Sequence, residues 1–155
     1  MNERRWQLLW VGWLGVILSL TIIYSNVFVG HSHWMLVQWL PSKGTGTWAE
    51  YGLDVVGNVL LFLPLGYAQG PAGLILTRRL LLSIGLTSLL LSMGIELFQV
   101  YSHNRLASTS DLFANTLGGL LGGLVYERLV APSRHAISTR SLHTPALSDS
   151  DSHTL

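Results

Sequence analysis

Four long apolar stretches constrain the fold of this chain more than any other feature of its sequence. They cover about residues 6–29, 51–72, 80–101 and 111–130, and the first of them contains no Asp, Glu, Lys or Arg. A helix needs roughly 20 mostly apolar residues to cross the hydrocarbon core of a membrane. The sequence therefore predicts an all-α polytopic membrane protein, a four-helix transmembrane bundle with one span in each stretch.

The overall composition agrees with a membrane protein and excludes several kinds of function. Apolar residues make up 49% of the chain and charged residues only 11%, whereas soluble domains are roughly one-quarter charged. The net charge of +1 provides no basic face, so we expect no nucleic-acid partner. Because the chain has no cysteine, disulfides, thiolate zinc sites and cysteine nucleophiles are excluded.

The arginines predict how the spans are oriented. Arg4 and Arg5 precede the first span, Arg78 and Arg79 lie between the second and the third, and further arginines follow the fourth. In a four-span hairpin arrangement all of them fall on one side, which the positive-inside rule makes cytoplasmic. We therefore expect both termini inside, a membrane domain over residues 1–132, and a disordered cytoplasmic tail over the polar residues 133–155.

The loop between the first two spans is predicted to lie at the outer membrane surface. Residues 31–41, HSHWMLVQWLP, are typical of a short interfacial helix, and residues 41–50 are typical of an irregular loop. The histidines near the outer side follow no familiar ligand spacing, so we expect neither a metal nor a cofactor. These histidines are His31, His33 and His103.

Each of the last three spans carries a pair of polar residues on one helix face. The pairs are Asp54 with Asn58, Glu96 with Gln99, and Asp111 with Asn115. Side chains three or four positions apart are neighbours on a helix, and in the predicted topology all three pairs lie in the outer leaflet. A carboxylate that faces lipid costs roughly 2.5–3.5 kcal/mol. We therefore predict that the three faces surround a polar pocket that opens outward.

The loop before the fourth span is predicted to complete this pocket. Arg105 lies there, and a guanidinium can bridge two carboxylates through bidentate hydrogen bonds. Ser108 or Ser110 is predicted to cap the fourth helix, whose positive end suits Asp111. The chief alternative for the whole set is that these polar groups only join helices to one another.

Small residues in the third and fourth spans predict close helix packing. Gly118 with Gly122, and Gly119 with Gly123, have the G-x-x-x-G spacing that lets two helices approach closely. A matching surface is expected on the third span from Ser88, Ser92 and Gly94. The glycine faces are also candidates for joining copies of the chain into a homo-oligomer.

Three motifs lie in order along the last three spans: NVLLFLPLG at 58–66, ELFQ at 96–99 and RLASTSDLFANTLGG at 105–119. Together they resemble the VanZ-like family of small bacterial integral membrane proteins, and the resemblance covers about residues 54–123. It implies a multi-pass protein of the bacterial inner (cytoplasmic) membrane with a link to the cell envelope. The family's namesake is associated with resistance to the glycopeptide teicoplanin. The matched polar positions are Asn58, Glu96, Gln99, Arg105, Asp111 and Asn115, whereas Asp54 is assigned to the pocket by spacing alone.

Three functions are consistent with such a pocket. The first is binding or modification of an envelope ligand, either a lipid-linked precursor or a glycopeptide, with Arg105 contacting its phosphate or carboxylate. The second is an integral-membrane enzyme that uses Glu96 and Asp111 as acid and base. The third is a structural or assembly subunit in which the cluster joins helices. A transporter is a fourth option, but four spans would have to oligomerise to alternate access.

Overall fold

The computed structural model describes residues 2–25, 31–40, 46–74, 79–102 and 106–130, and the regular secondary structure within these ranges is helical. Its α-helices are α1 (Glu3–Ser25), α2 (Trp48–Gln69), α3 (Leu80–Gln99) and α4 (Thr109–Leu129), and one short 3₁₀ helix, η1, covers Trp34–Leu36. No strand lies in the described ranges, so the predicted all-α class is confirmed. By length and composition, α2 and α3 are apolar enough to cross a membrane.

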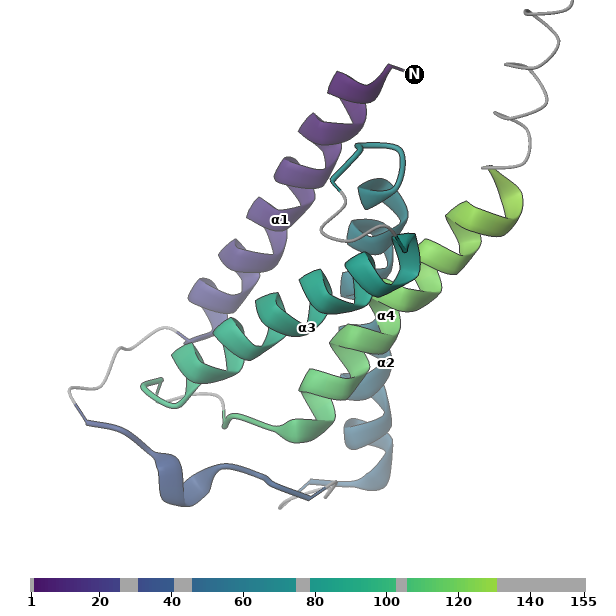
Figure 1. Ribbon diagram of the computed structural model, residues 1–155. Helices are drawn as coiled ribbons and strands as arrows, with labels where there is room; N and C mark the ends of the chain where they lie inside the picture. The colour runs from purple at the N-terminus through teal and green to yellow at the C-terminus, as the bar shows by residue number, and fades with distance from the viewer. Residues whose placement is uncertain (1, 26–30, 41–45, 75–78, 103–105, 131–155) are drawn as a thin grey trace, which may run out of the picture.

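The four helices alternate in direction along the chain (Figure 1). α2 and α4 pack against each other most extensively, α3 covers α4, and α1 lies mainly on α2 with little contact to α3. The N-terminus and the last turn of α4 lie at the same end of the molecule. The predicted tail, residues 133–155, lies outside the described residues.

Two glycines of α4 bring its backbone against that of α2. A Cβ added to Gly118 would lie 2.9 Å from the Cα of Val59, and one added to Gly122 would lie 2.7 Å from the backbone nitrogen of Tyr67. Contacts below 3.0 Å are essentially never seen for real Cβ atoms. Only glycine therefore permits this separation, as the G-x-x-x-G spacing predicted.

The second glycine face of α4 packs on α3. A Cβ added to Gly119 would lie 2.8 Å from the Cβ of Ser88. Gly123 is also buried, and a Cβ added there would lie 3.2 Å from a methyl group of Leu81. Gly94 was expected to join this small surface, but a Cβ there would meet nothing within 4 Å. Both glycine faces are covered within one chain, so homo-oligomerisation stays a prediction and would have to use other surfaces.

The hydrophobic core lies where α1, α2 and α3 meet. Ile17, Phe62, Leu65 and Ile95 are its buried members, and tryptophans of α1 pack against them. One of these, Trp13, also donates its Nε1–H to the carbonyl of Leu61 at 2.7 Å. This bond ties α1 to α2 inside the apolar region, where an unpaired indole donor would be costly.

Residues 31–40, here called the strap, cross the end of α3 and the start of α4. His33 donates its backbone N–H to Val100 at 2.8 Å, Gln38 donates to Ala107 at 2.9 Å, and Thr109 donates back to Gln38 at 3.1 Å. The predicted interfacial helix is therefore wrong except for the single turn of η1. Outside η1 the strap forms no helix, because its backbone pairs there with the segments around Val100 and Ala107.

Capping residues decide where two of the helices begin. α2 begins at Trp48, inside the segment predicted as a loop, because Thr47 and Glu50 form a reciprocal capping box. At α4 the side chain of Ser108 accepts the N–H of Ser110 at 3.2 Å, so of the two serines predicted as alternative caps, Ser108 is the one that caps this helix.

Candidate functional site

A cavity of about 260 Å³ lies at the end of the helices nearest the strap, and all four α-helices contribute to its wall. Its polar lining comes from three helices, two residues each. These residues are Asp54 and Asn58 of α2, Glu96 and Gln99 of α3, and Asp111 and Asn115 of α4. The structure thus brings together six of the seven residues that the sequence analysis assigned to one pocket. The seventh, Arg105, lies outside the described residues, as does His103.

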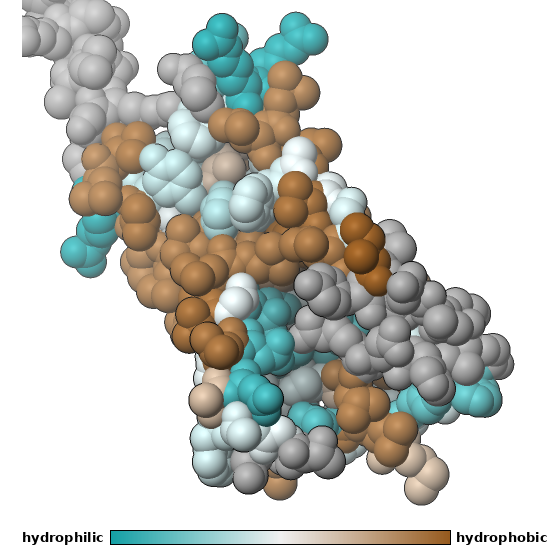
Figure 2. All heavy atoms as spheres, turned by 180° about the vertical axis from the view of Figure 1, so that it is seen from behind, coloured by the Kyte–Doolittle hydropathy of each residue, from teal (hydrophilic) through white to brown (hydrophobic). Residues whose placement is uncertain are grey.

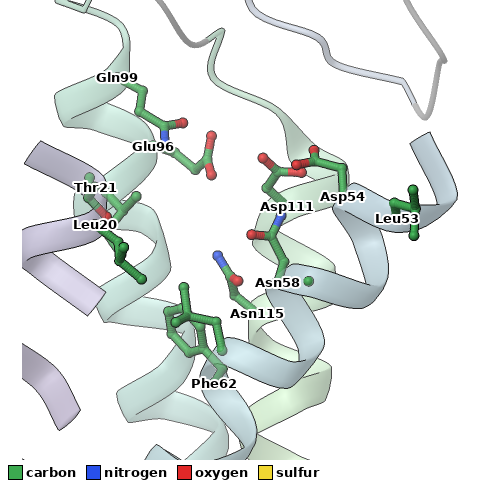
Figure 3. Close-up of a pocket in the computed structure, with 13 residues that line it drawn as sticks. Leu20, Thr21, Leu53, Asp54, Asn58, Phe62, Glu96, Gln99, Asp111 and Asn115 are labelled. Carbon is green, nitrogen blue, oxygen red and sulfur yellow. The ribbon is translucent and has the colours of Figure 1, made fainter. Parts of the chain in front are cut away.

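The side chains are arranged in layers within the cavity (Figure 3). Glu96 points from α3 across the cavity toward the opposite wall, which carries Asp54 of α2 and Asp111 of α4. Asn115 lies deeper, and buried Phe62 closes the bottom. The cavity therefore has an acidic upper part, amides in its walls and an apolar floor.

Hydrogen bonds orient several of these side chains. Oε2 of Glu96 accepts the backbone N–H of Ser108 at 2.7 Å, which joins α3 to the residue capping α4. Asn115 donates from Nδ2 to the hydroxyl of Ser92 at 2.9 Å, and both residues are buried. The Asn115 carbonyl oxygen is left directed away from this bond, because the two ends of a planar amide point in different directions.

Three amide atoms of the cavity wall are buried without a hydrogen-bond partner among the described residues. They are Oε1 of Gln99, Oδ1 of Asn115 and Nδ2 of Asn58. Gln99 and Asn115 are only 4% and 3% exposed. A buried polar atom that makes no hydrogen bond costs about 1–3 kcal/mol. Their convergence on one cavity is therefore best explained by a polar ligand or ordered water that supplies the missing partners.

The sequence analysis missed the fourth wall of the cavity. Leu20 and Thr21 of α1 line it opposite α2 and α4, whereas the pocket was predicted among the last three spans alone. The sequence does not mark Thr21 as a lining residue, because a threonine hydroxyl in a helix can donate its hydrogen bond to a backbone carbonyl of the same helix. Here it donates to the carbonyl of Ile17 at 2.9 Å.

A second polar cluster, also missed, joins α2 to α3 at the other end. Gln69 is 1% exposed and donates from Nε2 to the carbonyl of Leu74 at 2.8 Å and to the hydroxyl of Thr87 at 3.0 Å. Ser83 lies at 3.5 Å from the same nitrogen. These contacts tie the connection after α2 to α3, which is a structural role.

Within the described ranges, no group of three or more His, Asp or Glu side chains is placed to hold a metal ion. The expectation that the protein uses no cofactor stays a prediction.

A model of the VanZ/LLP1 family matches residues 8–130, which include all four helices apart from the first turn or so of α1. Neither the search of curated proteins nor the search of solved structures found a match for the chain. The matched region holds the cavity and all of its polar lining. Because the match extends over well more than half of its length, the chain belongs to the VanZ/LLP1 family.

Proposed function

We propose that this VanZ-like protein binds the polar head of a lipid-linked cell-envelope molecule in its cavity, from the outer side of the bacterial cytoplasmic membrane. The observation that carries the proposal is the convergence of three carboxylates and three amides on one cavity, with amide atoms left unpaired on its walls. Sugar and peptide groups of an envelope precursor would supply both donors and acceptors to these amides.

The proposal assumes that the protein crosses the membrane four times and has both termini on the cytoplasmic side. Hydrophobic side chains form a band across the middle of one face, and hydrophilic ones gather above and below it (Figure 2). The described arginines lie at the helix ends opposite the strap: Arg4 and Arg5 on α1, Arg79 before α3 and Arg128 on α4. The positive-inside rule makes that end cytoplasmic, so the strap and the cavity would face outward.

The test uses Gln99→Leu, which keeps the approximate size of the side chain and removes its unpaired oxygen. Replacing an unsatisfied buried polar group by an apolar one is nearly neutral or stabilising for the fold. Ligand binding, in contrast, should weaken at least about tenfold, which corresponds to about 1.4 kcal/mol. We would measure binding of a polyprenyl-diphosphate-linked muropeptide to the purified protein in nanodiscs by native mass spectrometry.

The control is Ser92→Ala, which removes the partner of Asn115 outside the cavity lining. It should lower thermal stability more than Gln99→Leu does and weaken binding less. If Gln99→Leu binds the muropeptide as tightly as the unmodified protein, the proposed function is wrong for this ligand. A cellular readout with the same variants is the susceptibility to teicoplanin and the profile of envelope lipids.

One observation favours a structural role instead. Asn115 and Ser92 form a buried hydrogen bond between α4 and α3, which is how polar groups join helices in membranes. If the cluster served only this role, every polar lining residue would contribute to stability. Asn58→Leu and Gln99→Leu would then both destabilise the protein, and neither would change glycopeptide susceptibility in cells that contain equal amounts of folded protein.

Catalysis by Glu96 and Asp111 is the second activity that the geometry suggests, because the two carboxylates face each other across the cavity. Such a pair can serve as acid and base when its members have different proton affinities. The lipid-linked muropeptide incubated with the protein would be analysed for products by mass spectrometry. A product formed by the unmodified protein and lost in Glu96→Gln would establish an enzyme, whereas binding without any product would leave a binding protein.

A further inference from the structure

An apolar groove of about 310 Å³ runs between α1 and α3 and shares two lining residues with the polar cavity. The shared residues are Thr21 and Ile95. Leu18 lines the groove from α1, and Leu90, Leu91, Gly94 and Phe98 line it from α3. The groove therefore adjoins the polar cavity on the flank of the molecule, with Thr21 and Ile95 at the boundary between them.

The groove exists because α1 does not close onto α3. α1 lies mainly against α2, where Trp13 is bonded to the Leu61 carbonyl. At the groove itself, α3 presents Gly94, around which an added Cβ would meet nothing within 4 Å. Two neighbouring groove residues, Leu18 and Leu90, are 41% and 56% exposed, so the groove is accessible along its length from the side.

Measured along α3, the cavity and the groove together extend over about the thickness of one membrane leaflet. Gln99 lies at the cavity and Leu90 at the far end of the groove on the same helix, and this separation corresponds to about 13.5 Å at 1.5 Å per residue. Half of a hydrocarbon core about 30 Å thick is about 15 Å. A chain anchored by its head in the cavity would therefore reach the midplane of the membrane along this groove.

We propose that the groove holds the hydrocarbon chain of the same molecule whose head occupies the cavity, so that ligands reach the site sideways from the outer leaflet between α1 and α3. The proposal rests on the proposed function above and adds the ligand class: an amphiphile with one long chain attached next to its polar head. A water-soluble molecule with the same head would bind only through the cavity.

Three glycine substitutions test the groove separately from the cavity. A Cβ at Gly94, Gly57 or Gly12 would meet nothing within 4 Å, so the first atom of a new side chain causes no clash at these positions, and thermal unfolding of each leucine variant checks that the protein still folds. Gly94 lines the groove, Gly57 lines the cavity, and Gly12 on α1 lines neither. The probes are the polyprenyl-diphosphate-linked muropeptide and the corresponding soluble nucleotide-linked muropeptide, both measured by native mass spectrometry in nanodiscs.

We expect Gly94→Leu to weaken binding of the polyprenyl probe at least tenfold and to leave binding of the soluble probe unchanged. Gly57→Leu should weaken binding of both probes, and Gly12→Leu should weaken neither. If Gly94→Leu binds the polyprenyl probe as Gly12→Leu does while Gly57→Leu is impaired, the groove proposal is wrong and the cavity proposal stands. If all three variants bind like the unmodified protein, both proposals are wrong.

A second measurement identifies the occupant directly. Because the chain contains no cysteine, Gly94→Cys can be labelled at one position with a benzophenone and irradiated in the presence of the polyprenyl probe. We expect a cross-link to the polyprenyl chain that the identically labelled Gly12→Cys does not form. Cross-linking at Gly94→Cys only to bulk phospholipid, or to a second copy of the chain, would overturn the proposal.

Discussion

Substitution of Gly122 by alanine tests whether the contact between α2 and α4 sets the geometry of the cavity. The added Cβ would lie 2.7 Å from the backbone nitrogen of Tyr67 and closer still to the carbonyl oxygen of Leu63. Ordinary contact begins at 3.4 Å, so from the nitrogen alone the two backbones must separate by at least about 0.7 Å, the difference between these two distances. Neither neighbour can rotate away, because both are backbone atoms.

Overpacking of this kind costs about 1–3 kcal/mol. For a chain of this size each kcal/mol lowers the melting temperature by about 2–4 °C, so Gly122→Ala should melt about 2–12 °C lower. The assay is thermal unfolding in nanodiscs followed by intrinsic fluorescence. Because α2 carries Asp54 and Asn58, the same shift should also weaken binding of the lipid-linked muropeptide.

Gly12→Ala is the matched control, since a Cβ at Gly12 of α1 would meet nothing within 4 Å. It should melt at or slightly above the temperature of the unmodified protein, because alanine favours a helix more than glycine does. If Gly122→Ala and Gly12→Ala melt together, close backbone contact between α2 and α4 does not hold the cavity walls in place, and the reasoning from the glycines fails.

Three further substitutions follow from single hydrogen bonds. Ser92→Ala, which removes the partner of Asn115, should lower the free energy of unfolding by about 0.6–1.7 kcal/mol. Ser108→Ala removes the cap of α4 and should lower the free energy of unfolding by about 0.5–2 kcal/mol. Amide hydrogen exchange should become faster only in the first turn of α4, and unchanged exchange there would contradict the assignment of Ser108 as the cap. Trp13→Phe removes the hydrogen bond to the Leu61 carbonyl and should lower the free energy of unfolding by about 0.5–1.5 kcal/mol in the same assay. A variant as stable as the unmodified protein would show that this bond does not hold α1 against α2.

The polar lining could be predicted because it depends on the geometry of single helices. Residues three or four positions apart share a helix face whatever surrounds the helix, and a membrane penalises carboxylates that face lipid. Each pair therefore lines the cavity as a unit. The same local reasoning narrowed the cap of α4 to Ser108 or Ser110, because capping involves only the residues next to a helix end, and the structure shows that it is Ser108.

Prediction failed where a segment's partner lies far away in the sequence. The strap was expected to be helical, but it bonds to Val100 and Ala107, and no local pattern reveals such partners. Gly94 was expected to pack against α4, yet it lies on the open groove instead. A glycine shows that close approach is possible, and only the packed structure decides whether a neighbour comes close.

The sequence by itself determined the all-α class and placed three polar pairs on single faces of three helices, since helical periodicity and apolar content act within each segment. Only the tertiary structure decided that α1 supplies the fourth wall, that both glycine faces are used inside one chain, and that α1 makes little contact with α3. Those features depend on which surfaces of distant segments fit together, and that fit is a property of packed side chains that no single stretch of sequence contains.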